Sequence, residues 1–241
     1  MNAALDDTMT IAERLHLIQQ QVADTARVYQ RDPREICILA VSKGQPASAI
    51  QEAFAAGVSD IGENYWQEAR EKLNALKHLP LTWHYIGPLQ SNKAKDIASH
   101  FDWVHSVERE KIACLLSQAR PLDRPPLNVC IQINLDREDS KSGIEPAKAA
   151  GLIERIHHLP SLRVRGFMAI PRPLAAEEEQ YASFQRLATL LQETNQRLHL
   201  QMDTLSMGMS DDLKAAIRAG STLVRIGRAI FGERPKTGKN E

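Results

Sequence analysis

The sequence is poor in cysteine, and the few cysteines that it has do not form a metal-binding pattern. Cys37, Cys114 and Cys130 are an odd number at wide spacing, and no CxxC pair is present. This spacing argues against both a disulfide framework and a zinc site. Cys37 and Cys130 lie in apolar runs typical of strands, so we expect buried free thiols and predict no metal site.

The sequence also lacks long apolar runs, an excess of charge of either sign, and a leader-like start. No run approaches the roughly 18–20 apolar residues that a membrane helix needs. Lysine and arginine number 30, as do aspartate and glutamate, so the formal net charge is zero. Residues 1–7 have neither the basic nor the apolar region of a signal peptide. We therefore expect a cytoplasmic protein that binds neither nucleic acid nor membranes.

What the sequence does contain is a regular alternation of short apolar runs and helix-like stretches. The chain has 241 residues, of which 43% are apolar, enough for one large α/β core. The first helix begins at Thr10, whose spacing to Glu13 is that of a capping box. The strands that we expect after it are residues 36–43, 60–65, 82–87, 102–107, 127–134, 163–170, 204–208 and 222–227.

Eight strand-then-helix units without a second composition class predict an α/β fold of the (β/α)8 TIM barrel type. We expect one domain over residues 1–241, with an extra helix at the N-terminus. A doubly wound open sheet is the alternative fold. In the barrel, functional residues lie where strands end.

Lys43 is the most unusual residue at an expected strand end. It closes an uncharged run that begins at Ile36, and an ammonium group there is costly unless it is paired or neutralised. One interpretation is a lysine whose head group reaches out to water. The other is a lysine with a lowered pKa that attacks a carbonyl carbon and forms a Schiff base.

The region after the seventh expected strand has the composition of a phosphate site. Ser206, Gly208 and Ser210 lie between that strand and a helix, and Gly227 ends the eighth strand. Loops after strands seven and eight often bind phosphate in this fold, although glycine and serine are also ordinary turn residues. Together with Lys43 they suggest a Schiff-base cofactor that carries a phosphate, and pyridoxal 5′-phosphate satisfies both ends. Arg225 would then contact the pyridine nitrogen, or else form a salt bridge at the strand end.

Seven stretches of the sequence resemble the pyridoxal phosphate homeostasis protein family, whose fold is similar to the barrel domain of alanine racemase. The resemblance follows nearly the whole chain in order. The stretches are residues 40–43 (AVSK), 62–65 (GENY), 83–93 (WHYIGPLQSNK), 140–143 (SKSG), 166–171 (GFMAIP), 206–212 (SMGMSDD) and 224–227 (VRIG).

The resemblance implies a set of cofactor-binding residues in this sequence. Lys43 would form the Schiff base, and Arg225 would contact the ring nitrogen. The others are Ser206, Gly227 and Arg228 around the phosphate, and Asn64 and Met168 along the ring. Two positions depart from the family pattern: Gly44-Gln45 replace a larger polar pair, and Arg228 stands where a small hydroxyl residue is usual.

The resemblance also implies a function. The protein would hold pyridoxal 5′-phosphate as a Schiff base on Lys43 and buffer or deliver it in intracellular vitamin B6 homeostasis. We expect no catalytic residue, a monomer or weak dimer, and pyridoxal phosphate-dependent apoenzymes as recipients. An arginine on the ring nitrogen leaves that nitrogen unprotonated and weakens the ring as an electron sink.

Two enzymes are alternatives. An amino-acid racemase needs a base on each face of the ring, and the residues that follow the last expected strand are too few for the further domain that supplies one. A class I aldolase also uses a barrel lysine, but it needs a neighbouring carboxylate, for which Glu63 is the candidate. A yellow purified protein would favour the pyridoxal phosphate interpretation.

Overall fold

The computed structural model describes residues 8–136 and 142–233, and in them eight parallel strands form a closed barrel. Each strand pairs with the next along the chain, and β1 pairs with β8, which closes the sheet. The open-sheet alternative is therefore wrong. The strands are β1 (Cys37–Val41), β2 (Asp60–Glu63), β3 (Thr82–Tyr85), β4 (Trp103–Val107), β5 (Leu127–Gln132), β6 (Leu162–Met168), β7 (Thr204–Ser206) and β8 (Leu223–Ile226).

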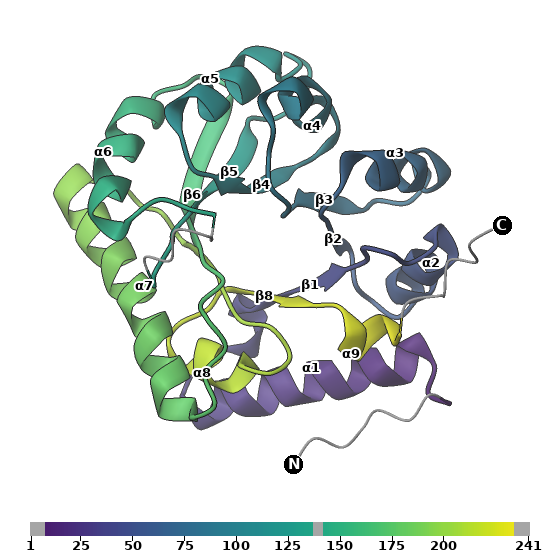
Figure 1. Cartoon of the computed structure of the whole chain (residues 1–241). Helices are drawn as coiled ribbons and strands as arrows, with labels where there is room; N and C mark the ends of the chain where they lie inside the picture. The colour runs from purple at the N-terminus through teal and green to yellow at the C-terminus, as the bar shows by residue number, and fades with distance from the viewer. Residues whose placement is uncertain (1–7, 137–141, 234–241) are drawn as a thin grey trace, which may run out of the picture.

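The helices surround the barrel, as Figure 1 shows. Together they cover the apolar outer side of the strands, which is the arrangement of a (β/α)8 fold. They are α1 (Ile11–Val28), α2 (Ala47–Ala55), α3 (Trp66–Ala75), α4 (Ala94–His100), α5 (Glu110–Ala119), α6 (Pro146–Ile156), α7 (Glu177–Leu198), α8 (Leu213–Arg218) and α9 (Arg228–Phe231), with 3-10 turns η1 (Pro33–Glu35) and η2 (Ser91–Lys93).

The extra N-terminal helix is present as α1, and its start confirms the capping box. The Thr10 hydroxyl accepts from the Glu13 N–H, while the Glu13 carboxylate accepts from the Thr10 N–H. The helix packs beside α2, α8 and α9 on one side of the barrel (Figure 1). Within the described ranges, none of the helices is long and apolar enough to cross a membrane.

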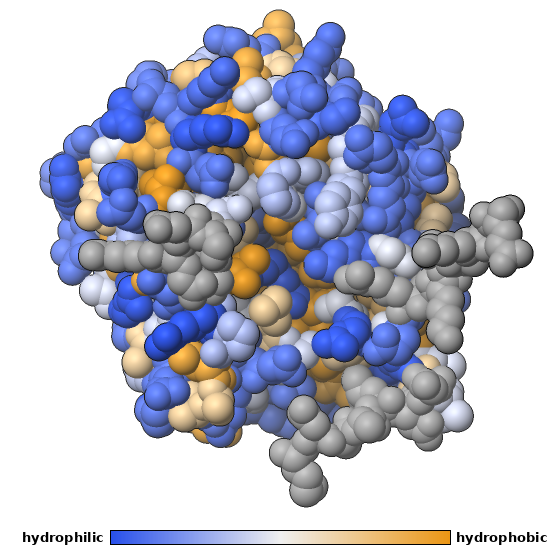
Figure 2. Space-filling view, viewed as in Figure 1, coloured by the Kyte–Doolittle hydropathy of each residue, from blue (hydrophilic) through white to orange (hydrophobic). Residues whose placement is uncertain are grey.

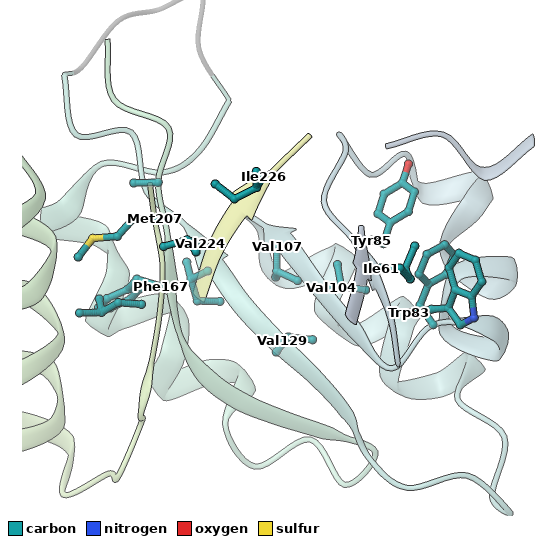
Figure 3. Packing of buried hydrophobic residues seen from close by; sticks show 14 of the residues in the cluster. Ile61, Trp83, Tyr85, Val104, Val107, Val129, Phe167, Met207, Val224 and Ile226 are labelled. Carbon is teal, nitrogen blue, oxygen red and sulfur yellow. The ribbon is translucent and has the colours of Figure 1, made fainter. Parts of the chain in front are cut away.

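The large apolar core lies between the strands and the helices. In Figure 3, Phe167 and Met207 lie on one side of the barrel and Trp83 and Tyr85 on the other. Tyr85 meets Phe101, after α4, edge to face with ring centroids 5.3 Å apart. In Figure 2 the outer helices are largely hydrophilic, while apolar residues show at the middle of the same face.

The inside of the barrel is unusually polar. Side chains alternate between the two faces of a strand, so the residue between Trp83 and Tyr85 points inward. That residue is His84, and it bonds to His105 of β4 within the barrel. Branched apolar residues commonly fill this space in such folds. Here polar groups occupy part of it, and they lie next to the expected site.

The element boundaries differ from the sequence expectations mostly at strand ends. The expected strands 36–43 and 163–170 are shorter in the structure, because Ser42, Lys43 and Ala169 already belong to loops. Helix α9, directly after β8, was not expected. The motif at residues 140–143 and the ends of the expected domain lie partly outside the described residues.

Candidate functional site

The seven predicted site residues come together on one arc of the barrel. Met168 and Ser206 end β6 and β7, Arg225 is in β8, and Lys43 and Asn64 follow β1 and β2. These five strands are consecutive neighbours in the closed sheet, and Met168 is in register with Ser206. Because parallel strands end at the same rim, the arrangement is that of one site.

The loop that carries Lys43 is fixed on both sides by helix α3. Lys72 donates from Nζ to the carbonyl oxygen of Ser42 at 2.7 Å. The backbone N–H of Gly44 donates to Glu68 Oε1 at 2.5 Å, and Lys72 binds the same carboxylate at 2.6 Å. Lys43 itself is half-buried in the turn. The backbone before and after it is thus tied to one ion pair, which limits where its amine can lie.

Glu63 belongs to this support and not to the mouth of the barrel. Its side chain is fully buried and lies 2.6 Å from Nζ of Lys72, and it accepts a bond from the Ser42 hydroxyl. Burial raises the pKa of Glu63, while Lys72 and Ser42 oppose that rise. The carboxylate suggested for an aldolase is therefore committed to holding the Lys43 loop.

Asn64 is held by a close approach of two backbones. A Cβ at Gly87 would lie 2.0 Å from the carbonyl oxygen of Asn64, so only glycine fits there. The carbonyl of Gly87 in turn accepts from the Ser106 hydroxyl at 2.6 Å. Asn64 Oδ1 is buried and has no hydrogen-bond partner among the described residues. An orphaned buried acceptor is costly, and it is typical of a group that a ligand would satisfy.

Arg225 lies inside the barrel with its guanidinium at the ends of β6 and β7. Nη1 donates to the carbonyl and the hydroxyl oxygen of Ser206 at 2.6 and 2.9 Å, and Nη2 donates to the carbonyl of Ala169 at 2.9 Å. Among the described residues, Nε–H and one Nη2 hydrogen keep no partner. Burial lowers the pKa of Arg225 to about 10, so it is still charged at neutral pH.

Ser206 has a role that the sequence did not indicate. Its hydroxyl is fully buried and lies 2.8 Å from Nδ1 of His105 as well as 2.9 Å from Arg225. A phosphate contact by this hydroxyl would have to displace one of these partners. The predicted contact stays a prediction, and the observed role of Ser206 is to join Arg225 to His105.

The remaining predicted residues lie at the ends of β6 and β8. Met168 is buried at the end of β6. Gly227 caps the short helix α9, and Arg228 begins it with its side chain largely exposed. A Cβ at Gly227 would lie 3.4 Å from the Val41 carbonyl, so the backbone there is closely packed but leaves room for a methyl group.

The sequence reasoning missed His105 and gave His84 no role. Both are almost completely buried, at 0% and 1% exposure. The alternation of side chains along each strand indicates their inward position, because each histidine lies between residues that face the helices, as in Trp83-His84-Tyr85. Inward histidines in two adjacent strands could have been read as neighbours inside a barrel.

Known proteins match the chain over most of its length. The family model for the alanine racemase N-terminal domain matches residues 17–235. The pyridoxal phosphate homeostasis protein of Pseudomonas aeruginosa is 54% identical over 225 residues, which cover 93% of this chain and 96% of the relative. The protein of the same name from Escherichia coli is 48% identical over 227 residues, covering 93% and 97%.

Solved structures resemble the chain over the same extent. PipY of Synechococcus elongatus, solved with and without PLP (pyridoxal phosphate) bound, is 37% identical with a TM-score of 0.81, and the match covers 92% of this chain and 100% of PipY. Alanine racemase from Corynebacterium glutamicum is 16% identical with a TM-score of 0.68, covering 95% of this chain and 62% of the racemase. The second likeness shows a shared fold.

Proposed function

Because the chain belongs to the family of pyridoxal phosphate homeostasis proteins, we propose that it binds pyridoxal 5′-phosphate and buffers or delivers it in vitamin B6 homeostasis. The observation that carries the proposal is that Lys43 and Arg225 lie at the same rim of the barrel as Asn64, whose side-chain oxygen is buried without a partner among the described residues. PipY, which is similar over nearly the whole chain, was solved with PLP bound. The domain of residues 1–241 as a single cofactor-binding unit is part of the same proposal.

The residues at the rim fit the groups of this cofactor. When bound, pyridoxal phosphate supplies an aldehyde that condenses with a primary amine and releases water. Lys43 would hold that carbon, and the remaining N–H donors of Arg225 would face the ring nitrogen. Asn64 and Met168 would lie along the ring. The backbone at Gly227 and Arg228, with Ser206 close by, would hold the phosphate.

Arg225 supports a binding protein without turnover. A guanidinium is always a donor, so it leaves the ring nitrogen without a proton and limits how well the ring takes up electrons. Glu63, which an aldolase would use as its carboxylate, is already paired with Lys72. The alanine racemase structure, at 16% identity, shows a shared fold and carries no argument for racemase activity.

We propose that the protein also delivers pyridoxal phosphate to other proteins. A protein that releases this cofactor unchanged to pyridoxal phosphate-dependent apoenzymes needs no catalytic residues of its own. We propose that this occurs in the cytoplasm, which agrees with the three free thiols of Cys37, Cys114 and Cys130. We also propose that the protein is a monomer or a weak dimer.

The test is a titration of the purified protein with pyridoxal phosphate, followed by transfer. We expect saturable visible absorbance that borohydride abolishes by reducing the covalent bond. The loaded protein should then restore activity to an apoenzyme faster than borohydride-treated protein does. A protein that gains no absorbance at saturating cofactor would refute the binding function.

A further inference from the structure

A continuous chain of hydrogen bonds crosses the interior of the barrel. Asp60, the first residue of β2, has Oδ1 2.9 Å from Nε2 of His84. Nδ1 of His84 lies 3.0 Å from Nε2 of His105. Nδ1 of His105 lies 2.8 Å from the Ser206 hydroxyl, which is 2.9 Å from Nη1 of Arg225. The chain joins the start of β2 to the group that faces the proposed cofactor.

Water reaches this chain at its Asp60 end. The side chain of Asp60 is 29% exposed, whereas His84 is 1% exposed and His105 is fully buried. Asp60 and His84 line a cavity of about 430 Å³ at the amino-terminal mouth of the barrel. The carboxylate therefore meets solvent on the face opposite to the site.

With both imidazoles neutral, the carboxylate at one end fixes the direction of every bond in the chain. A guanidinium only donates and a carboxylate only accepts. Ser206 thus accepts from Arg225 and donates to Nδ1 of His105. His105 donates from Nε2–H to Nδ1 of His84, and His84 donates from Nε2–H to Asp60. This single arrangement satisfies all links with both imidazoles neutral and protonated on Nε2.

The electrostatic surroundings favour a neutral His105. Burial, together with His84 and Arg225, keeps the pKa of His105 well below its ordinary value. Burial acts to raise the pKa of Asp60, but the bond from His84 and smaller contributions outweigh it and lower the pKa. The other titratable groups around the chain are Glu35, Cys37, Cys130, Arg165, Asp203 and Asp212.

We propose that His84 and His105 are positioning residues: they hold the Arg225 guanidinium against the ring nitrogen of bound pyridoxal phosphate and link it to the Asp60 carboxylate at the far mouth. The inference rests on the proposed function, since it assigns the support of that same site. Asp212 is the carboxylate whose charge acts on Arg225 directly, whereas Asp60 is linked to Arg225 through polarised hydrogen bonds. A change of charge at the amino-terminal mouth should therefore change the visible spectrum and the apparent pKa of bound pyridoxal phosphate.

The first test needs no cofactor. Heteronuclear NMR of the imidazole nitrogens in the full chain should show His84 and His105 as neutral Nε2–H tautomers. The His105 signal should not titrate between about pH 6 and 8, although an ordinary histidine has a pKa of about 6.5, because burial lowers its pKa. A charged imidazole at neutral pH, or a proton on Nδ1, would overturn the chain as drawn.

The second test compares variants in the presence of pyridoxal phosphate. His105→Leu removes both links, and we expect a shifted visible maximum and affinity weaker by about tenfold or more. His105→Gln offers one acceptor and one donor, so it should recover most of both. Identical spectra and affinities for the wild type and His105→Leu would refute the inference alone. No binding by the wild type would refute the proposed function instead.

A charge variant at the mouth keeps the test valid if His105→Leu does not fold. Asp60→Asn retains an acceptor but loses the charge, so the apparent pKa of the bound chromophore should fall, because a negative charge favours protonation. Asp203→Asn is the matched control, since Asp203 lines the same cavity but bonds to Arg165 outside the chain. An equal shift in both variants would show a general field effect and overturn the role of the chain.

Discussion

Lys43 lies in the turn after β1, where its backbone neighbours are tied to Lys72 and Glu68. Its amine is the proposed covalent anchor, while Arg225 would contact the other side of the ligand. We expect Lys43→Ala to lose the borohydride-stable label yet keep part of its affinity, because the second anchor remains. Mass spectrometry of the reduced protein and an equilibrium titration measure the two effects separately.

Lys95 provides a matched control for this variant. It is an exposed lysine of α4, so Lys95→Ala should be labelled and should bind as the wild type does. A main label on any lysine other than Lys43, or full labelling of Lys43→Ala, would contradict the assignment.

Gly227 tests the position of the phosphate. A Cβ there would lie 3.4 Å from the Val41 carbonyl, an ordinary contact, so Gly227→Ala should fold. If the phosphate lies against this backbone, pyridoxal should bind the wild type roughly a hundredfold more weakly than pyridoxal phosphate, since each charge-assisted bond contributes about 1.5–3 kcal/mol. Gly227→Ala should weaken pyridoxal phosphate much more than pyridoxal. Equal affinity of the wild type for the two aldehydes would place the phosphate elsewhere.

At the scale of elements, α3 stabilises the loops after β1 and β2 through one buried ion pair. Lys72→Met would leave the carboxylate of Glu63 buried without its cation, and such a loss costs about 3–5 kcal/mol. We expect that loss in chemical denaturation, together with weaker cofactor binding because the Lys43 loop is released. Lys72→Met combined with Glu63→Gln should recover much of the stability, since no unpaired charge remains.

The pH dependence of that variant checks the cause. Burial already raises the pKa of Glu63, and without Lys72 the pKa should rise further. A buried acid with a raised pKa is tolerated while protonated, so the destabilisation should be smaller at about pH 5 than at about pH 8. A cost that is the same at both values would indicate lost packing rather than an unpaired charge.

The elements themselves were largely predictable, whereas their partners across the barrel were not. The continuous apolar run from Ile36 to Val41 identified a buried parallel strand, and Lys43 was recognised because a charge followed that run. Helix α9 is four residues long and has no periodicity to detect. The bond between His105 and Ser206 joins positions 101 residues apart. Alternation shows which face each occupies, but only closure of the barrel brings them together.

At the scale of the whole molecule, a buried neutral histidine makes stability depend on pH. His105 takes up a proton at about pH 6.5 when unfolded, but burial lowers its pKa in the folded protein. The unfolded state therefore binds more protons as pH falls below that value, and this contribution to stability is lost toward acid, by up to about 1.4 kcal/mol per pH unit. His105→Gln should show a shallower loss than the wild type in denaturation between about pH 7 and 5. Parallel curves would contradict a neutral buried His105.

The barrel resembles the racemase domain in fold, and the groups that we propose for its ligand are the amine of Lys43 and the guanidinium of Arg225. Racemisation needs proton transfer on both faces of the ring and a ring that accepts electrons, and Arg225 disfavours the second. We expect alanine racemisation by the loaded protein to stay far below about 1 s⁻¹, the lower end of typical enzyme turnover. Chiral chromatography after long incubation measures it, with alanine racemase as the positive control and Lys43→Ala as the background. A rate of about 1 s⁻¹ or more that disappears in Lys43→Ala would make the protein an enzyme.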